Sequence, residues 1–99
     1  MKYIHDDSTP VVTGSAIADA VIEDAAALGA HGLSDTVHVP TFDEHGTAVT
    51  ATLLLGPASQ IVVAEAPDDL LEPEDDDLVA TLRAAARRLG AERVPHADQ

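Results

Sequence analysis

Histidine and carboxylate side chains are the groups in this sequence with the potential to bind a metal ion or to catalyse a reaction. The chain of 99 residues contains five histidines, and the best local group is His31, Asp35 and His38. Imidazole and carboxylate groups bind zinc and related divalent metals when they converge on one point. This group defines one hypothesis, a small-molecule-binding protein or minor enzyme with its site at these residues. However, His31 and Asp35 fall in a predicted loop and the spacing matches no metal motif. We therefore expect ordinary surface histidines, with neither metal nor cofactor.

The other motifs in the sequence do not predict catalysis. The chain has no cysteine for thiolate chemistry, and no serine stands in the Gly-x-Ser-x-Gly context of a nucleophile elbow. Seven of the ten residues 68–77 are acidic, but they lack the alternating carboxylates and turn glycine of a calcium loop. The run Val-Val-Thr-Gly-Ser at residues 11–15 lacks the further glycines of a dinucleotide-binding fingerprint. No motif identifies a family of known function, and we expect a protein without enzymatic activity.

The distribution of charge limits the partners of this protein. Five Lys and Arg against eighteen Asp and Glu give a formal net charge of −13, and residues 3–82 contain sixteen acids and no Lys or Arg. Such a surface repels phosphate, so we expect neither nucleic acid nor an anionic membrane as a partner. A basic protein partner fits this charge, and an acidic mimic of nucleic acid is a further alternative. The sequence shows no signal peptide and no apolar run long enough to span a membrane, which favours a cytoplasmic protein.

Apolar residues at helical spacing predict two amphipathic helices. The first covers about residues 15–29, places Asp24 on its polar side, and takes its N-terminal cap from Thr13 or Ser15. The second covers about residues 74–89, with acids in its first turn and arginines toward its end, as the helix dipole favours. Neither Arg83 nor Arg87 has an acid four residues earlier on its own helix. We therefore expect the helices to lie side by side, with the arginines of the second close to the acids of the first: Arg83, Arg87 and Arg88 near Asp19, Glu23 and Asp24.

Between the helices, the sequence predicts an antiparallel meander of three strands at residues 36–42, 47–55 and 60–66. If a three-residue loop places Gly46 in the left-handed conformation, Asp43 pairs with Thr47. That register puts one apolar set of side chains on a single face: Val37, Val39 and Thr41 opposite Leu53, Ala51 and Val49. The other face then carries His38, Pro40 and Phe42 with Thr52, Thr50 and Ala48.

The third predicted strand is apolar on both sides. Because Glu65 belongs in solvent or at an edge, we assign Val62 and Ala64 to the core that the helices cover. This assignment leaves Ile61 and Val63 on the second face of the sheet.

The predicted architecture is a two-layer α+β sandwich, in one acidic domain over residues 1–99. An antiparallel sheet of three strands, to which Lys2–His5 can add a fourth, is covered on one face by both helices. Residues 94–99 are expected to form a disordered tail.

Two helices can cover only one face of so small a sheet, and this leaves the second face apolar. Monomers seldom expose a contiguous apolar patch of several hundred Å². We therefore expect a small non-enzymatic interaction or accessory module that acts as a homodimer. The expected interface consists of Phe42, Leu54, Ile61, Val63, His38, Thr50 and Thr52.

Overall fold

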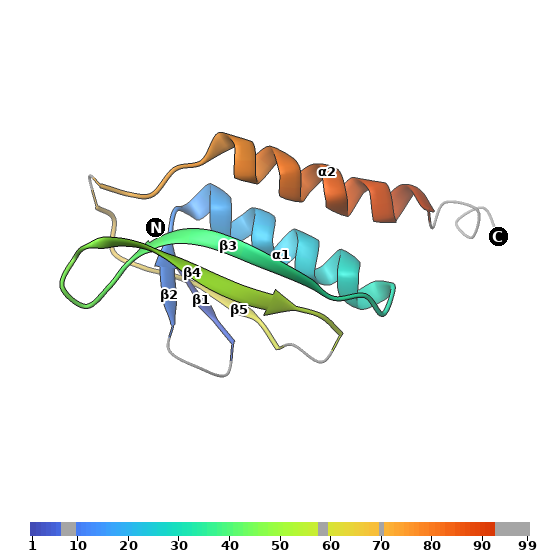
Figure 1. The fold of residues 1–99 in the computed structure, drawn as a ribbon, viewed down its shortest axis with the longest axis horizontal. Helices are drawn as coiled ribbons and strands as arrows, with labels where there is room; N and C mark the ends of the chain where they lie inside the picture. The colour runs from blue at the N-terminus through green and yellow to red at the C-terminus, as the bar shows by residue number, and fades with distance from the viewer. Residues whose placement is uncertain (7–9, 58–59, 70, 93–99) are drawn as a thin grey trace.

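A computed structural model describes residues 1–6, 10–57, 60–69 and 71–92 of the chain (Figure 1). The tail expected at residues 94–99 lies outside the described residues. Within them, the elements in chain order are β1 (Lys2–His5), β2 (Val11–Thr13), α1 (Ser15–Ala30), β3 (Asp35–Phe42), β4 (Ala48–Leu55), β5 (Val62–Glu65) and α2 (Asp76–Glu92).

The elements pack in two layers, which confirms the predicted α+β sandwich. The described strands form an antiparallel three-stranded sheet in the order β2-β1-β5 and a separate antiparallel pair of β3 and β4. Helices α1 and α2 lie side by side, and α1 packs against strands of both sheets (Figure 1). The centre of the core is fully buried and includes Ile4, Ile17, Val21, Val39 and Leu55.

The β3–β4 hairpin has the predicted register. The Asp43 N–H donates to the Thr47 carbonyl at 2.9 Å, and the Gly46 N–H donates to the Asp43 carbonyl at 3.0 Å. Gly46 has a φ of 78°, the left-handed conformation that the three-residue loop requires. Consequently Val39 lies opposite Ala51, and His38 lies opposite Thr52.

The predicted meander is wrong in its third strand, because β5 pairs with β1 and not with β4. Tyr3 lies opposite Ala64 on one side and opposite Val12 on the other, so β1 is the central strand of its sheet. The pattern of apolar residues in β5 predicts a strand but does not select its neighbour. A hairpin between β4 and β5 would favour a short turn. However, β4 ends at Leu55 and β5 begins only at Val62. This longer connection allows β5 to pair with the N-terminal strand β1.

Two threonine side chains join the two sheets where β2 passes β3. The Thr13 hydroxyl donates to the Pro40 carbonyl at 2.7 Å, and the Thr41 hydroxyl donates to the Val12 carbonyl. Pro40 has no N–H to donate, so its backbone suits a position that faces away from the β4 ladder. These bonds bring the two sheets together as one surface.

The beginning of α1 differs from the prediction, since neither Thr13 nor Ser15 caps it. The N-cap residue is Gly14, and the Ser15 N–H donates to Glu72 Oε2 at 3.0 Å. This bond is the main reason why the pKa of Glu72 lies below its ordinary value. A Cβ atom on Gly14 would lie 2.0 Å from the Pro73 carbonyl oxygen, so glycine is what allows the 72–73 segment to approach.

Both helices end later than predicted, α1 at Ala30 and α2 at Glu92, and α2 also begins later. In α1, Ala30 is the last residue, and Gly32 after it takes the left-handed conformation, with a φ of 67°. Helix α2 begins at Asp76, because the Asp75 carboxylate accepts the Leu78 N–H at 3.0 Å and acts as its cap.

Candidate functional site

The surface with the most distinctive composition is the outer face, the side of the two sheets that points away from the helices. Its residues alternate with core residues along each strand. By register, the outer face consists of Tyr3, His5, Val12, Thr36, His38, Pro40, Phe42, Ala48, Thr50, Thr52, Leu54, Val62 and Ala64. None of these is Asp, Glu, Lys or Arg, although the chain has a net charge of −13. The described strands thus place no acid on this side, although Glu74 and Asp69 line the hollows at its border.

The outer face also exposes two large apolar side chains. Leu54 is 66% exposed on β4, and Val62 is 60% exposed on β5. Between the strands of the hairpin, His38 Nδ1 and Thr52 Oγ1 lie 3.0 Å apart. The polar groups of this face are therefore hydroxyls and imidazole rings, and none of them is a carboxylate, the side chain that is most costly to bury.

Five of the seven residues predicted for the interface lie on the outer face: Phe42, Leu54, His38, Thr50 and Thr52. Ile61 and Val63 do not, because both pack against the buried core. Val63 lies opposite the fully buried Ile4, whereas Val62 lies opposite His5. The predicted orientation of β5 is therefore reversed.

The side chain of Glu65 explains why the sequence suggested the wrong orientation. Glu65 does share the helix side of β5 with Val63, but it stands at the end of the strand and is 84% exposed. Its Oε2 lies 4.0 Å from Lys2 Nζ, on the neighbouring strand β1. A strand at the margin of a sheet can thus place a carboxylate in solvent from its core-facing side. Val12 and Val62 are outer-face residues that the sequence argument missed.

Two hollows border the outer face at the turn end of the hairpin. One has a volume of about 490 Å³ and is lined by Phe42, Val49, Leu71 and Glu74, among others. The second has a volume of about 400 Å³ and includes Tyr3, Phe42 and Leu71. Leu71 is shared by both and is 72% exposed, so its side chain is an uncovered apolar wall.

The structure does not assemble His31, Asp35 and His38 into one site. Asp35 and His38 are three positions apart on β3, so their side chains lie on opposite sides of the strand. Asp35 Oδ1 accepts the N–H of Thr36, and His31 lies beyond the last turn of α1. Within the described residues, no three His, Asp or Glu side chains are arranged to hold a metal ion.

A buried carboxylate at Asp24 is the polar feature that the sequence argument missed. Asp24 is 1% exposed, and neither of its oxygens has a hydrogen-bond partner among the described residues. Burial raises its pKa above the ordinary value, and the nearby charge of Asp35 raises it further. The signal was its spacing, because Asp24 follows Val21 by three positions and precedes Leu28 by four, which places it on the core side of α1.

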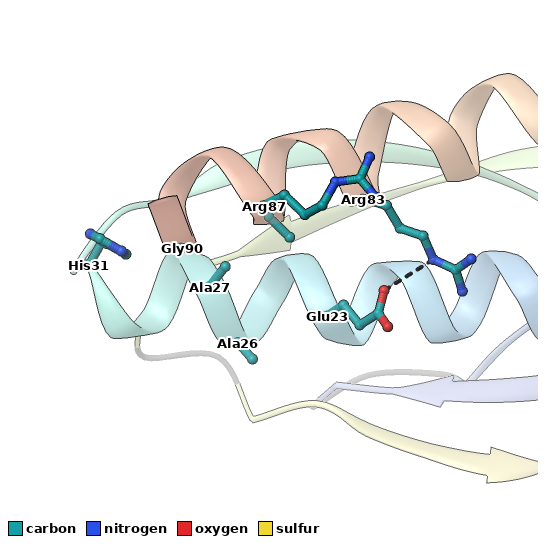
Figure 2. A pocket seen from close by; sticks show the side chains of 8 residues that line it. Glu23, Ala26, Ala27, His31, Arg83, Arg87 and Gly90 are labelled. Atoms are coloured by element: carbon teal, nitrogen blue, oxygen red, sulfur yellow. Dashed lines mark hydrogen bonds and ion pairs between the residues drawn. The ribbon is translucent and has the colours of Figure 1, made fainter. Parts of the chain in front are cut away.

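A groove between the two helices contains two basic residues of α2, Arg83 and Arg87 (Figure 2). It has a volume of about 630 Å³, and its floor consists of small residues such as Ala26 and Ala27. Arg83 Nε lies 3.2 Å from Glu23 Oε2 across the groove, which confirms the expected approach of an α2 arginine to an α1 acid. Arg87 lines the same groove.

Comparison with known proteins gives no match: no family model, no curated protein and no solved structure resembles the chain. In the described part of the chain, neither helix is both long and apolar enough to cross a membrane.

Proposed function

We propose that this protein is a non-enzymatic interaction module that acts as a homodimer through its outer face. The observation that carries the proposal is that none of the described strand residues on that face is Asp, Glu, Lys or Arg, on a chain with a net charge of −13. An acidic protein can associate with a copy of itself only if the contact area excludes most of its carboxylates, because like charges brought together in an interface oppose binding.

The composition of the outer face supports burial against an identical face. Leu54 and Val62 supply exposed apolar area, and burial contributes about 25 cal/mol per Å² before the costs of association. Threonines such as Thr50 and Thr52 add short side chains that lose little rotational freedom on burial. In a twofold arrangement, the same patch serves both partners, so one uncharged face is sufficient.

Light scattering on charge-insertion variants tests the homodimer. We expect a dimer for the unmodified protein, and monomers for Leu54→Glu and Val62→Glu, since each places a carboxylate in the interface. Ala80→Glu is the matched control, because Ala80 is exposed on α2 and the variant carries the same added charge. It should remain a dimer. The proposal fails if the unmodified protein is monomeric at about 100 μM, well above a micromolar Kd, or if all three variants dissociate alike.

A further inference from the structure

We propose that the free edge of β4 binds an extended, cationic segment of a partner protein as an added strand. The free edge is defined by the backbone N–H and C=O groups of Ala48, Thr50 and Thr52. This inference goes beyond the homodimer, because it assigns a different surface, the strand edge and not the sheet face, to a different kind of partner.

The hydrogen-bond pattern of the hairpin determines which way these backbone groups point. In an antiparallel pair, residues alternate between those that bond to the partner strand and those that point away from it. The Asp43 N–H bonds to the Thr47 carbonyl, and Pro40, which lies opposite Thr50, has no N–H. Residues 47, 49, 51 and 53 therefore bond to β3, and Ala48, Thr50 and Thr52 present their backbone groups on the opposite side.

In the described part of the chain, no strand pairs with that side of β4. Ala48, Thr50 and Thr52 are all exposed, and their backbone groups make no other hydrogen bond among the described residues. Residues 47–55 contain no charged residue and no proline. Proteins usually protect a long edge strand with Lys, Pro or a bulge, so β4 has the features of an edge kept open for pairing.

The hollow beside the first half of β4 supplies a side-chain pocket for such a strand. Strand addition takes affinity from main-chain hydrogen bonds and specificity from pockets that receive alternate side chains. The 490 Å³ hollow is lined by Ala48, Val49 and Thr50 of β4. Leu71 adds an exposed apolar side chain to this lining, and Glu74 adds a carboxylate. It suits an apolar side chain next to a basic one.

The acidic residues around the hairpin favour a cationic segment over a second copy of the chain as the partner of this edge. Acids stand at both ends of the hairpin, with Asp43 and Glu44 at the turn and Asp35 at the start of β3, and Glu74 lines the hollow. A basic peptide gains from this surface at both ends of β4, whereas a second chain of charge −13 meets repulsion there.

A synthetic peptide probe separates strand pairing from simple charge attraction. The probe is fluorescein-labelled Arg-Val-Thr-Val-Thr-Val-Arg, and its binding is measured by fluorescence anisotropy. The matched control has the same sequence with every central amide N-methylated, which keeps the charge but blocks hydrogen bonding. We expect N-methylation to weaken binding at least about tenfold, equivalent to the loss of one or more hydrogen bonds. A second peptide with Glu in place of Arg should bind less tightly than the cationic probe.

Two protein variants locate the peptide on the edge. Thr50→Pro removes an N–H that points away from β3, so the variant should keep its circular dichroism spectrum and lose peptide binding. Val62→Glu should bind the peptide as the unmodified protein does, whether or not it disrupts a dimer. Equal binding of the N-methylated and unmethylated peptides, equal binding of the acidic peptide, or loss of binding in Val62→Glu would each overturn the inference. The N-methylated control uses unmodified protein, so the test does not depend on how Thr50→Pro folds.

Discussion

The two sheets of this protein are built in opposite ways. In the hairpin, β3 and β4 are neighbours in the sequence, and a tight turn at Gly46 sets their register. In the other sheet, β1 pairs with β5 (Val62–Glu65), which is distant from it in the sequence, and charged groups brace the arrangement. Lys2 Nζ lies 2.7 Å from Asp19 Oδ1 and 4.0 Å from Glu65 Oε2. The hairpin depends on local conformation, whereas the three-stranded sheet depends on contacts between distant segments.

The same difference appears at the two outermost strands. Strand β5 is four residues long and ends at Glu65, so its edge is short and marked by a carboxylate. Strand β4 is eight residues long and uncharged, and its edge has none of this protection. A short, charged edge resists pairing with other chains and a long, uncharged one invites it. The two ends of the sheet layer therefore differ in how readily they pair with another strand, and substitutions in each sheet test what sets them apart.

The largest expected effect tests the orientation of β5. Val63→Asp places a carboxylate against the core, opposite the buried Ile4, and should lower the free energy of unfolding by about 3 kcal/mol. Val62→Asp, at the exposed adjacent position, should cost less than about 0.5 kcal/mol. Urea denaturation of both variants, at protein concentrations low enough to exclude association, measures the difference. A larger loss of stability for Val62→Asp than for Val63→Asp would show that Val62, and not Val63, faces the core.

Sequence reasoning succeeded where neighbours in the chain are neighbours in the fold. The hairpin register followed from Gly46 and the alternation of residues around it, and five of the predicted interface residues lie on the outer face for that reason. It failed where a distant segment decides the outcome. The partner of β5 is the N-terminal strand, and Glu72 replaces Thr13 or Ser15 as the group that binds the start of α1. Such contacts leave no local pattern of residue types to read.

The next effect concerns Asp24, the buried carboxylate of the helix layer. The pKa of Asp24 is higher in the folded protein than its ordinary value. The stability that protonation of Asp24 adds to the folded state is therefore fully present below the ordinary pKa, and it is lost as the pH rises through the folded pKa. Asp24→Asn should therefore stabilise the protein by about 1–2 kcal/mol near pH 8, and by less as the pH falls toward about 4. Thermal denaturation across this pH range measures the effect.

The matched control for Asp24→Asn removes one charge from an exposed position. Glu44→Gln lies in the hairpin turn, where its side chain is mostly in solvent. It should change the melting temperature little, and should not reproduce the pH dependence. A stabilisation by Asp24→Asn that is equal at high and low pH would show that burial of the charge is not its cause.

A smaller effect tests the local basis of the hairpin. Gly46→Ala forces a side chain into the left-handed region and should destabilise the protein by about 1 kcal/mol. Gly90→Ala is a control of opposite sign, because Gly90 lies within α2, where a Cβ would meet no atom within 4 Å. Alanine there should stabilise the helix by up to about 1 kcal/mol. If both substitutions change stability in the same direction, the turn conformation does not explain the register.

The smallest expected effect tests the charged bracing of the three-stranded sheet. Lys2→Met should lower the melting temperature by less than Gly46→Ala does, because the ion pair with Asp19 is partly exposed and holding two flexible side chains together offsets much of its attraction. Arg87→Met removes the same charge from a residue without an ion pair among the described residues, and it is the matched control. In about 0.5 M NaCl, where the Debye length is roughly 4 Å, the difference between the two variants should shrink. A difference that persists at this salt concentration would mean that Lys2 acts through packing of its aliphatic stem, and the contrast between a locally specified hairpin and an electrostatically braced sheet would no longer hold.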